Sequence, residues 1–188
     1  MKVSKAQVQE NRARIVETAS TLFREKGYDG VGIADLMAAA GFTHGGFYKH
    51  FPSKVDLMAE AATCGIAHTL EQASGMNIDD YIALYLSREH RDARGAGCTL
   101  AALSGDATRQ SDIVRAAFEA GIEKTLTEFI SQSISSDEGH NREARSEALS
   151  VIAHTLGAIV LSRACPAGSP LADEILNACR DRIIGRNR

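Results

Sequence analysis

Apolar residues recur along the chain at intervals of three and four, which is the spacing of an amphipathic helix. The clearest stripe contains Ile15, Ala19 and Phe23 and ends at Gly27. We find no alternation of the kind that marks a β-strand. With its capping and helix-ending residues, the pattern predicts an all-α fold with helices at 8–26, 33–40, 43–50, 54–74, 79–89, 98–103, 112–133, 142–165 and 171–184 and a polar surface loop at 135–140.

The composition is typical of a globular protein, with 44% hydrophobic and 24% charged residues in a chain of 188. No run of about 18 apolar residues is present, so we expect no membrane span. The first residues are polar and lack the apolar segment of a secretion signal, which leads us to expect a cytoplasmic protein. The four cysteines form no C-x-x-C pair and are expected to be free thiols in that compartment.

Charge is distributed unevenly, although the net charge is only −3. Residues 1–54 hold eight lysines and arginines against five acidic residues, whereas the remainder holds 13 basic and 19 acidic residues. A basic end on an acidic body is the asymmetry expected when one end meets phosphate. We therefore expect a small basic domain at 1–54 and a larger helical domain at 55–188.

The segment 33–50 has the plan of a helix-turn-helix, in which two short helices are joined by a tight turn, here at Gly41. The apolar residues that fix the angle between the helices are Leu36, Ala40, Phe42 and Phe47. The second helix presents an outward face formed by His44, Gly45, Gly46 and Lys49. Each of the two glycines costs a helix about 1 kcal/mol relative to alanine. We interpret them as a place where the backbone approaches another surface closely.

Together these residues resemble the DNA-binding region of the TetR/AcrR family of transcriptional regulators. The resemblance covers residues 10–58 and rests on A-x-x-L-F at 19–23, K-G-Y at 26–28, D-L at 35–36, A-G-F-T at 40–43, G-F-Y-x-H-F at 46–51 and S-K-x-x-L at 53–57. It implies a three-helix DNA-binding domain followed by a larger helical domain for ligand binding and dimerisation. One departure is Val31-Gly32, where the family has threonine or serine. We expect it to remove one phosphate contact and to leave the fold intact, because glycine is an acceptable helix cap.

The resemblance also implies roles for individual residues. The expected DNA contacts are Thr43, His44, Gly45, Gly46, Tyr48, Lys49, His50 and Lys54. Of these, His44 and the two glycines face base edges, Thr43 caps the recognition helix and touches phosphate, and the others meet phosphates or neighbouring bases. Phe47 and Phe51 are expected in the core. Arg12 and Arg14 are expected to be solvated charges rather than DNA contacts.

The larger domain carries candidate ligand and partner contacts. Residues that suit a small-molecule cavity are His68, Tyr81, Tyr85, Cys98, Phe118 and His154, with general core packing as the alternative. By the resemblance, the last two long helices form a four-helix dimer interface through Leu149, Ile152, Ala153, Leu156, Ile159, Val160, Leu171, Ile175 and Ala178. An intrachain core is the alternative here, and we favour the dimer because such a helix-turn-helix reads half-sites in pairs.

Cys98 is a candidate sensor of oxidants or electrophiles. It opens a helix after G-A-G at 95–97, and the positive end of the helix dipole favours a thiolate. Arg91 and Arg94 are close in sequence. The alternative interpretation is a small buried residue at a tight helix contact.

Other chemistry is not indicated. The histidines show no metal-ligand spacing, and no phosphate-binding loop or nucleophile motif is present, so we expect no metal, no cofactor and no enzymatic activity. The sequence predicts a homodimeric repressor that binds double-stranded operator DNA and is released by an unknown small molecule, without a membrane partner. An activator, a DNA-binding protein without effector, and a regulator acting through Cys98 are the alternatives.

Overall fold

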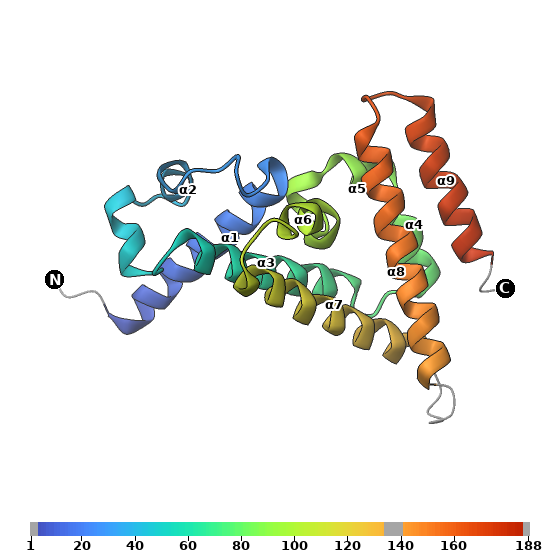
Figure 1. The fold of residues 1–188 in the computed structure, drawn as a ribbon, viewed down its shortest axis with the longest axis horizontal. Coiled ribbons are helices and arrows are strands. Elements are labelled where there is room, and N and C mark those ends of the chain that lie inside the picture. The colour runs from blue at the N-terminus through green and yellow to red at the C-terminus, as the bar shows by residue number, and fades with distance from the viewer. Residues whose placement is uncertain (1–3, 134–140, 186–188) are drawn as a thin grey trace. The chain divides into compact units, whose positions relative to one another are not determined.

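The computed structural model describes residues 4–133 and 141–185, and every regular element in these residues is helical (Figure 1). The predicted all-α fold class is confirmed. The chain divides into two compact units, of which the first joins the segment up to Thr69 with Cys98–Gly121 and the second joins Leu70–Gly97 with the segment from Ile122 onward. The predicted boundary at residue 54 separates a DNA-binding domain from the rest of the chain. The division into compact units does not test DNA binding, so this boundary stays a prediction.

The first unit is built around the N-terminal helix. Its elements are α1 (Lys5–Lys26), α2 (Ile33–Ala39), the 3-10 helix η1 (His44–Lys49), most of α3 (Lys54–Ala73), α6 (Thr99–Ala107) and the N-terminal part of α7 (Asp112–Ser133). The predicted stripe on α1 is buried, since Ile15, Ala19 and Phe23 have no exposed surface. Apolar residues of the other elements complete this core, among them Leu36, Met37, Phe47, Phe51, Leu57 and Ala61. Burial of each large side chain contributes about 1.5–3 kcal/mol to folding.

The second unit contains the C-terminal helices. Its elements are α4 (Ile78–Tyr85), α5 (Arg88–Asp92), the short η2 (Arg94–Ala96), the rest of α7, α8 (Asn141–Ala164) and α9 (Pro170–Ile184). Helices α8 and α9 lie side by side as an antiparallel pair (Figure 1). The buried Ser162 hydroxyl of α8 donates to the Ala172 carbonyl of α9 at 2.9 Å, which fixes the two helices in register.

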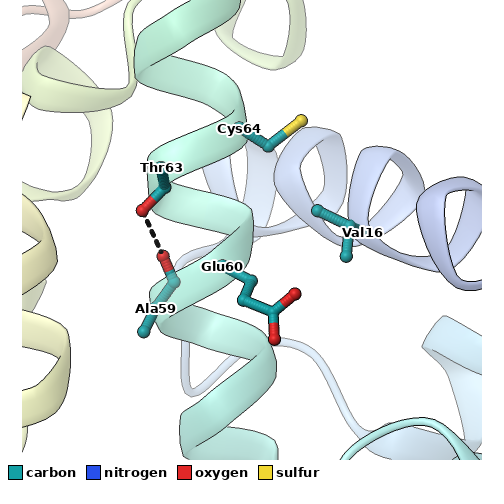
Figure 2. Close-up of a pocket in the computed structure, with 5 residues that line it drawn as sticks. All are labelled: Val16, Ala59, Glu60, Thr63 and Cys64. Atoms are coloured by element: carbon teal, nitrogen blue, oxygen red, sulfur yellow. Dashed lines mark hydrogen bonds between the residues drawn. The ribbon is translucent and has the colours of Figure 1, made fainter.

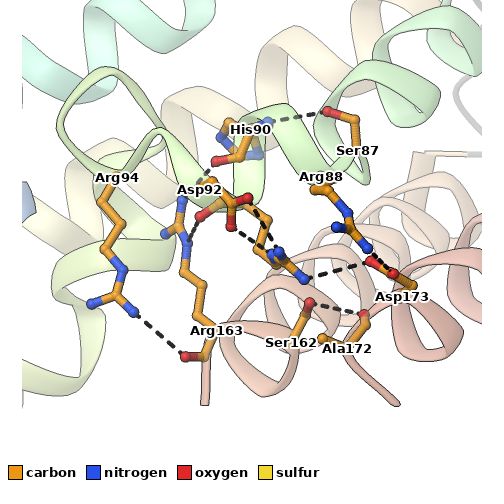
Figure 3. A network of polar contacts seen from close by, with 10 residues as sticks. Ser87, Arg88, His90, Asp92, Arg94, Ser162, Arg163, Ala172 and Asp173 are labelled. Carbon is orange, nitrogen blue, oxygen red and sulfur yellow. Dashed lines mark hydrogen bonds and ion pairs between the residues drawn. The ribbon is translucent and has the colours of Figure 1, made fainter. Parts of the chain in front are cut away.

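A network of polar contacts ties α5 to α8 and α9 (Figure 3). Arg163 of α8 donates to two carbonyls at the end of α5, at 2.9 and 3.0 Å. Arg91 is only 5% exposed; it pairs with Asp92 at 2.7 Å and lies 3.5 Å from Asp173 of α9. The hydrogen bond from Arg91 lowers the pKa of Asp92. A buried charge is tolerated when it is paired in this way.

The predicted helices at 33–40, 54–74, 112–133, 142–165 and 171–184 agree with the structure to within one residue. Helix α1 begins earlier than expected, because the Ser4 side chain caps it by accepting the Gln7 amide at 3.1 Å. The loop predicted at 135–140 lies outside the described residues.

Two predicted helix ends are wrong. The single helix expected at 79–89 is two helices, because Leu86 leaves helical geometry with ψ 40° and the Ser87 side chain caps α5. The helix expected at 98–103 continues to Ala107, because Gly105 has no left-handed backbone and α6 passes through it. Gly27, by contrast, has a φ of +74° and ends α1.

Candidate DNA-binding surface

The turn between α2 and η1 is built as predicted. Gly41 has a φ of +82°, the left-handed conformation that glycine adopts without strain. The amide of Phe42 donates to the Met37 carbonyl at 2.7 Å and closes the end of α2. A side-chain carbon added at Gly41 would meet no atom within 4 Å, so the backbone conformation alone requires glycine.

The second helix of the motif is a 3-10 helix rather than the expected α-helix. Its amides donate to carbonyls three residues earlier, from Gly46 to Thr43 and from His50 to Phe47, both at 2.9 Å. Two adjacent glycines disfavour a regular α-helix at this place. Thr43 occupies the N-cap position, but its side chain accepts no capping hydrogen bond, contrary to the expected role.

Phe47 is the buried residue of η1, and most of the other residues of this helix are exposed. Phe47 is fully buried, with its ring 5.6 Å from Phe51, which confirms the core role expected of both. Tyr48 packs edge-on against Phe47 at 5.2 Å and remains 65% exposed. Among the expected DNA contacts, the exposed residues are Thr43, His44, Gly45, Tyr48 and Lys49, and the partly covered ones are Gly46, His50 and Lys54. The buried anchor thus presents a polar face on η1.

The expectation that Arg12 is a solvated charge is wrong. Both terminal nitrogens of its guanidinium donate to the carboxylate of Glu60 on α3. Its Nε donates to the His50 carbonyl at 3.4 Å, at the end of η1. The guanidinium carbon also lies 4.6 Å from the centre of the Phe51 ring. One side chain of α1 therefore contacts α3 and the end of the recognition helix together.

Two other basic side chains near the motif rest on aromatic rings. The guanidinium carbon of Arg14 lies 4.6 Å from the centre of the Phe42 ring, although Arg14 is exposed. Lys54 Nζ donates to the Tyr28 carbonyl at 2.6 Å and lies 5.9 Å from the Phe23 ring. The Lys54 ammonium is thus engaged within the unit, and its contact with phosphate stays a prediction.

The N-terminus of α2 has no side-chain cap. Gly32 takes the N-cap position with extended backbone, and no hydroxyl accepts an amide there. Val31 before it is 2% exposed and contributes to the core. Helix α2 forms nonetheless, which confirms that the departure at Val31-Gly32 leaves the fold intact.

A buried arginine lies beside the candidate sensor cysteine. Arg24 is 8% exposed, and its Nη1 donates to Ser20 Oγ at 2.6 Å and to Thr99 Oγ1 at 3.4 Å. Burial lowers the pKa of Arg24, and electrostatic interactions with Cys64 and Cys98 act in the opposite direction. Cys98 itself is 6% exposed and occupies the N-cap position of α6. The sulfur is therefore both buried and close to a guanidinium.

A groove of about 360 Å³ opens between α1 and α3 (Figure 2). Its lining residues are Val16, Ala59, Glu60, Thr63 and Cys64. Figure 2 shows Glu60 and Cys64 projecting from α3 towards Val16, while the Thr63 hydroxyl donates to the Ala59 carbonyl at 3.0 Å. None of the six residues expected to line a ligand cavity belongs to this groove.

Those six residues are divided between the two units. The first unit contains His68, Cys98 and Phe118, and the second contains Tyr81, Tyr85 and His154. Within the second, the rings of Tyr81 and Tyr85 lie 5.7 Å apart, as their four-residue spacing on one helix predicts. Their assignment to a ligand cavity stays a prediction.

The residues expected at a dimer interface leave apolar surface exposed on α8 and α9. Leu149, Val160 and Leu171 are 43%, 49% and 54% exposed, and the neighbouring Leu161 is 60% exposed. Ile159 is an exception, because it is fully buried in the core of its own chain. By length and composition alone, α8 is long and apolar enough to cross a membrane, although it contains no long uninterrupted run of apolar residues. Only 28% of its most apolar window is buried within the structure. This helix carries more apolar surface than its own chain covers.

The same features occur in known proteins. A family model described as bacterial regulatory proteins of the tetR family matches residues 15–61, which include the whole helix-turn-helix. An uncharacterized HTH-type transcriptional regulator of Mycobacterium tuberculosis is 31% identical over 173 residues, covering 81% of this chain and 84% of that protein. The chain belongs to the TetR family.

Two further comparisons agree with this TetR-family assignment. The HTH-type transcriptional repressor DhaR of Mycobacterium sp. strain GP1 is 32% identical over 114 residues, covering 55% of this chain and 56% of that protein. A TetR-family regulator from Cytophaga hutchinsonii shares the fold, with a TM-score of 0.73 and 22% identity over 98% of both chains. This TetR-family protein is a helix-turn-helix DNA-binding transcriptional regulator, with an N-terminal DNA-binding domain before a larger helical domain.

From the sequence alone, Arg12 is misassigned and Glu60 is not singled out. They are 48 positions apart, and no local pattern links them. Only long-range contact information would have paired them. Metal chemistry offers no further site in the described residues, where no group of histidine, cysteine and acidic side chains gathers closely enough to hold an ion.

Proposed function

We propose that this regulator binds a palindromic operator as a homodimer and represses transcription until a small molecule releases it. The observation that supports the proposal most is the geometry of η1. A fully buried Phe47 anchors this short helix, and the side chains of His44, Tyr48 and Lys49 are exposed on it. Imidazole, phenol and ammonium groups are suited to hydrogen bonds with base edges and with phosphates.

Base contacts are assigned to His44, Gly45 and Gly46, because recognition helices meet base edges with their N-terminal residues. A carbon added at Gly45 would have no neighbour within 4 Å, so this residue offers a bare backbone to a partner surface. Phosphate contacts, or contacts with neighbouring bases, are assigned to Thr43, Tyr48, Lys49, His50 and Lys54. For Lys54 the assignment requires its ammonium to exchange the Tyr28 carbonyl for a phosphate oxygen.

The homodimer is assigned to α8 and α9. The interface is formed by the exposed and half-buried members of the predicted set, Leu149, Ile152, Ala153, Leu156, Val160, Leu171, Ile175 and Ala178, with the addition of Leu161. Several large apolar side chains exposed on two adjacent helices support an interaction site there. A two-fold dimer places the two copies of η1 in successive major grooves, with half-site centres about 34–36 Å apart.

Repression and release by a small molecule complete the proposal. The relative DhaR is described as a transcriptional repressor, which supports the same role here. Release follows if the effector binds more tightly to one of two dimer arrangements that differ in operator affinity. The candidate effector contacts remain His68, Tyr81, Tyr85, Cys98, Phe118 and His154. A reporter with the operator in its promoter separates repression, which lowers expression, from activation, which raises it.

A second candidate function is the sensing of electrophiles by Cys98. Arg91 and Arg94 are held by other partners, but the buried Arg24 interacts electrostatically with Cys98 and Cys64. The sulfur of Cys98 would add to the β-carbon of an α,β-unsaturated carbonyl compound, and the thiol proton would be transferred to the α-carbon. N-ethylmaleimide should then weaken operator binding of the wild type and spare Cys98→Ser. Unchanged binding of the treated wild type would overturn this candidate.

DNA binding is tested by titrating a selected operator duplex with the regulator and following fluorescence anisotropy at several salt concentrations. Lys49→Ala should weaken binding to all sequences alike and lower the salt slope by about one for each phosphate that the lysine neutralises. His44→Ala should instead change base preference, by about 1–3 kcal/mol at one base pair. Arg115→Ala, which removes an exposed charge on α7, is the control and should change neither. An unchanged salt slope in the first variant and unchanged preference in the second would contradict the proposal.

A further inference from the structure

The carboxylate of Glu60 and the guanidinium of Arg12 form a two-pronged ion pair between α3 and α1. Both terminal nitrogens of Arg12 donate to the two carboxylate oxygens. The Arg12 and Glu60 side chains are 32% and 38% exposed, so the pair is partly shielded from water. A fork-to-fork pair of this kind fixes the orientation of the guanidinium as well as its position.

The oriented guanidinium reaches the recognition helix at its C-terminal end. Its third nitrogen, Nε, donates to the His50 carbonyl at 3.4 Å, and its central carbon lies 4.6 Å from the centre of the Phe51 ring. The helix itself is six residues long and carries two glycines, so its own hydrogen bonds hold its shape weakly. The contact from Arg12 at the C-terminal end of the helix supplements the buried anchor Phe47.

We propose that Arg12 and Glu60 are positioning residues that set the orientation of the recognition helix for base-specific binding. Glu60 holds the guanidinium in place, and Arg12 transmits that placement to the His50 carbonyl and the Phe51 ring. The inference rests on the proposed DNA binding and deepens it, because it assigns part of the sequence specificity to residues that do not touch DNA. Non-specific attraction to phosphate does not require this orientation.

The competing account is that Arg12 contacts a phosphate directly. The two accounts predict opposite changes in the operator affinity of Glu60→Gln. Glu60→Gln removes a negative charge from the DNA-binding unit, so electrostatics alone predicts tighter binding to every duplex. Positioning predicts weaker binding to the operator, because the amide no longer holds the guanidinium by two charged hydrogen bonds. Glu17→Gln is the matched control, since it removes one exposed carboxylate from α1.

The experiment measures the affinity of the full-length regulator for its selected operator and for a scrambled duplex across a salt series. We expect Glu60→Gln to weaken operator binding about threefold to tenfold while scrambled-duplex binding is unchanged or tighter, and Glu17→Gln to preserve the ratio of the two affinities. Arg12→Lys keeps the charge but loses the fork, and it should lower the ratio in the same way with an unchanged salt slope.

Each other outcome overturns the inference. Operator binding by Glu60→Gln that is as tight as in the wild type, or tighter, would contradict positioning, and so would an Arg12→Lys variant with the wild-type ratio. Thermal unfolding of both variants, followed by circular dichroism, separates a change of orientation from a loss of fold, because a general loss of structure weakens binding to both duplexes. A wild type that selects no operator overturns the proposed function itself and this inference with it.

Discussion

Replacing Gly45 by alanine should separate DNA binding from stability. The residue lies in η1 without a left-handed backbone, and an added carbon would meet no atom within 4 Å. Alanine is favoured over glycine in a helix by about 1 kcal/mol and also restricts the unfolded chain. A six-residue 3-10 helix realises only part of this difference. We therefore expect Gly45→Ala to raise the free energy of unfolding by about 0.5 kcal/mol.

The affinity of Gly45→Ala for the operator should fall, although the stability of the variant rises. If the backbone at Gly45 lies against a base edge, a methyl group there occupies the space that the base needs. We expect at least a tenfold loss of affinity, which corresponds to about 1.4 kcal/mol, measured by fluorescence anisotropy at one fixed salt concentration. The free energy of unfolding is measured in parallel by urea denaturation, so that both effects are obtained on the same preparation.

Gly105→Ala is the matched control for this prediction. Gly105 lies inside α6 of the same unit, and a carbon added there also meets no atom within 4 Å. The substitution should stabilise the protein by about 0.5–1 kcal/mol and leave operator affinity unchanged. Wild-type affinity in Gly45→Ala would refute the close approach of the backbone to DNA, and a large loss of stability would refute the open environment of the residue.

Three further substitutions test other parts of the structure. Gly65→Ala should destabilise the first unit by about 1–3 kcal/mol in urea unfolding, because the new carbon collides with the Thr99 hydroxyl. A variant as stable as the wild type would show that α1, α3 and α6 pack less closely. Burial lowers the pKa of His90 below its ordinary value of 6.5, so stability should fall as the pH decreases from 6.5 towards the folded-state pKa. His90→Gln should lose this dependence in unfolding experiments at about pH 7.5 and about pH 5.5, and its persistence would assign it to other groups. Leu161→Glu should convert the proposed dimer to monomers in sedimentation velocity, whereas Leu84→Glu, at a similarly exposed position on α4, should not. A dimeric Leu161→Glu would count against the α8 interface.

Local signals in the sequence were sufficient for most of the fold. The stripe from Ile15 to Phe23 and the long helices α7, α8 and α9 follow from apolar spacing, because a helix buries one face whatever covers it. The turn at Gly41 follows from a single residue with a positive φ. The buried Phe47 and Phe51 follow from their places in a recognisable motif.

Contacts between distant residues account for what the sequence did not reveal. Arg12 is interpreted as a solvated charge because nothing near it in the chain indicates Glu60. Lys54 is expected at a phosphate, and its contact within the unit is not foreseen, because the acceptor is the backbone carbonyl of the distant Tyr28. Ile159 matches the apolar spacing of an interface residue, yet it packs within its own chain. An apolar stripe on a helix shows which residues are buried, but it does not show whether their own chain or a partner buries them.

Sequence-specific binding of DNA by a dimer is the central claim, and selection of duplexes from a random library by the purified regulator tests it most directly. The salt concentration is held near the physiological value, because non-specific binding depends steeply on it. We predict enrichment of an inverted repeat whose half-site centres lie about one helical turn apart, or slightly more. Enrichment of no sequence, or of a single unrepeated site, would contradict sequence-specific binding by a dimer.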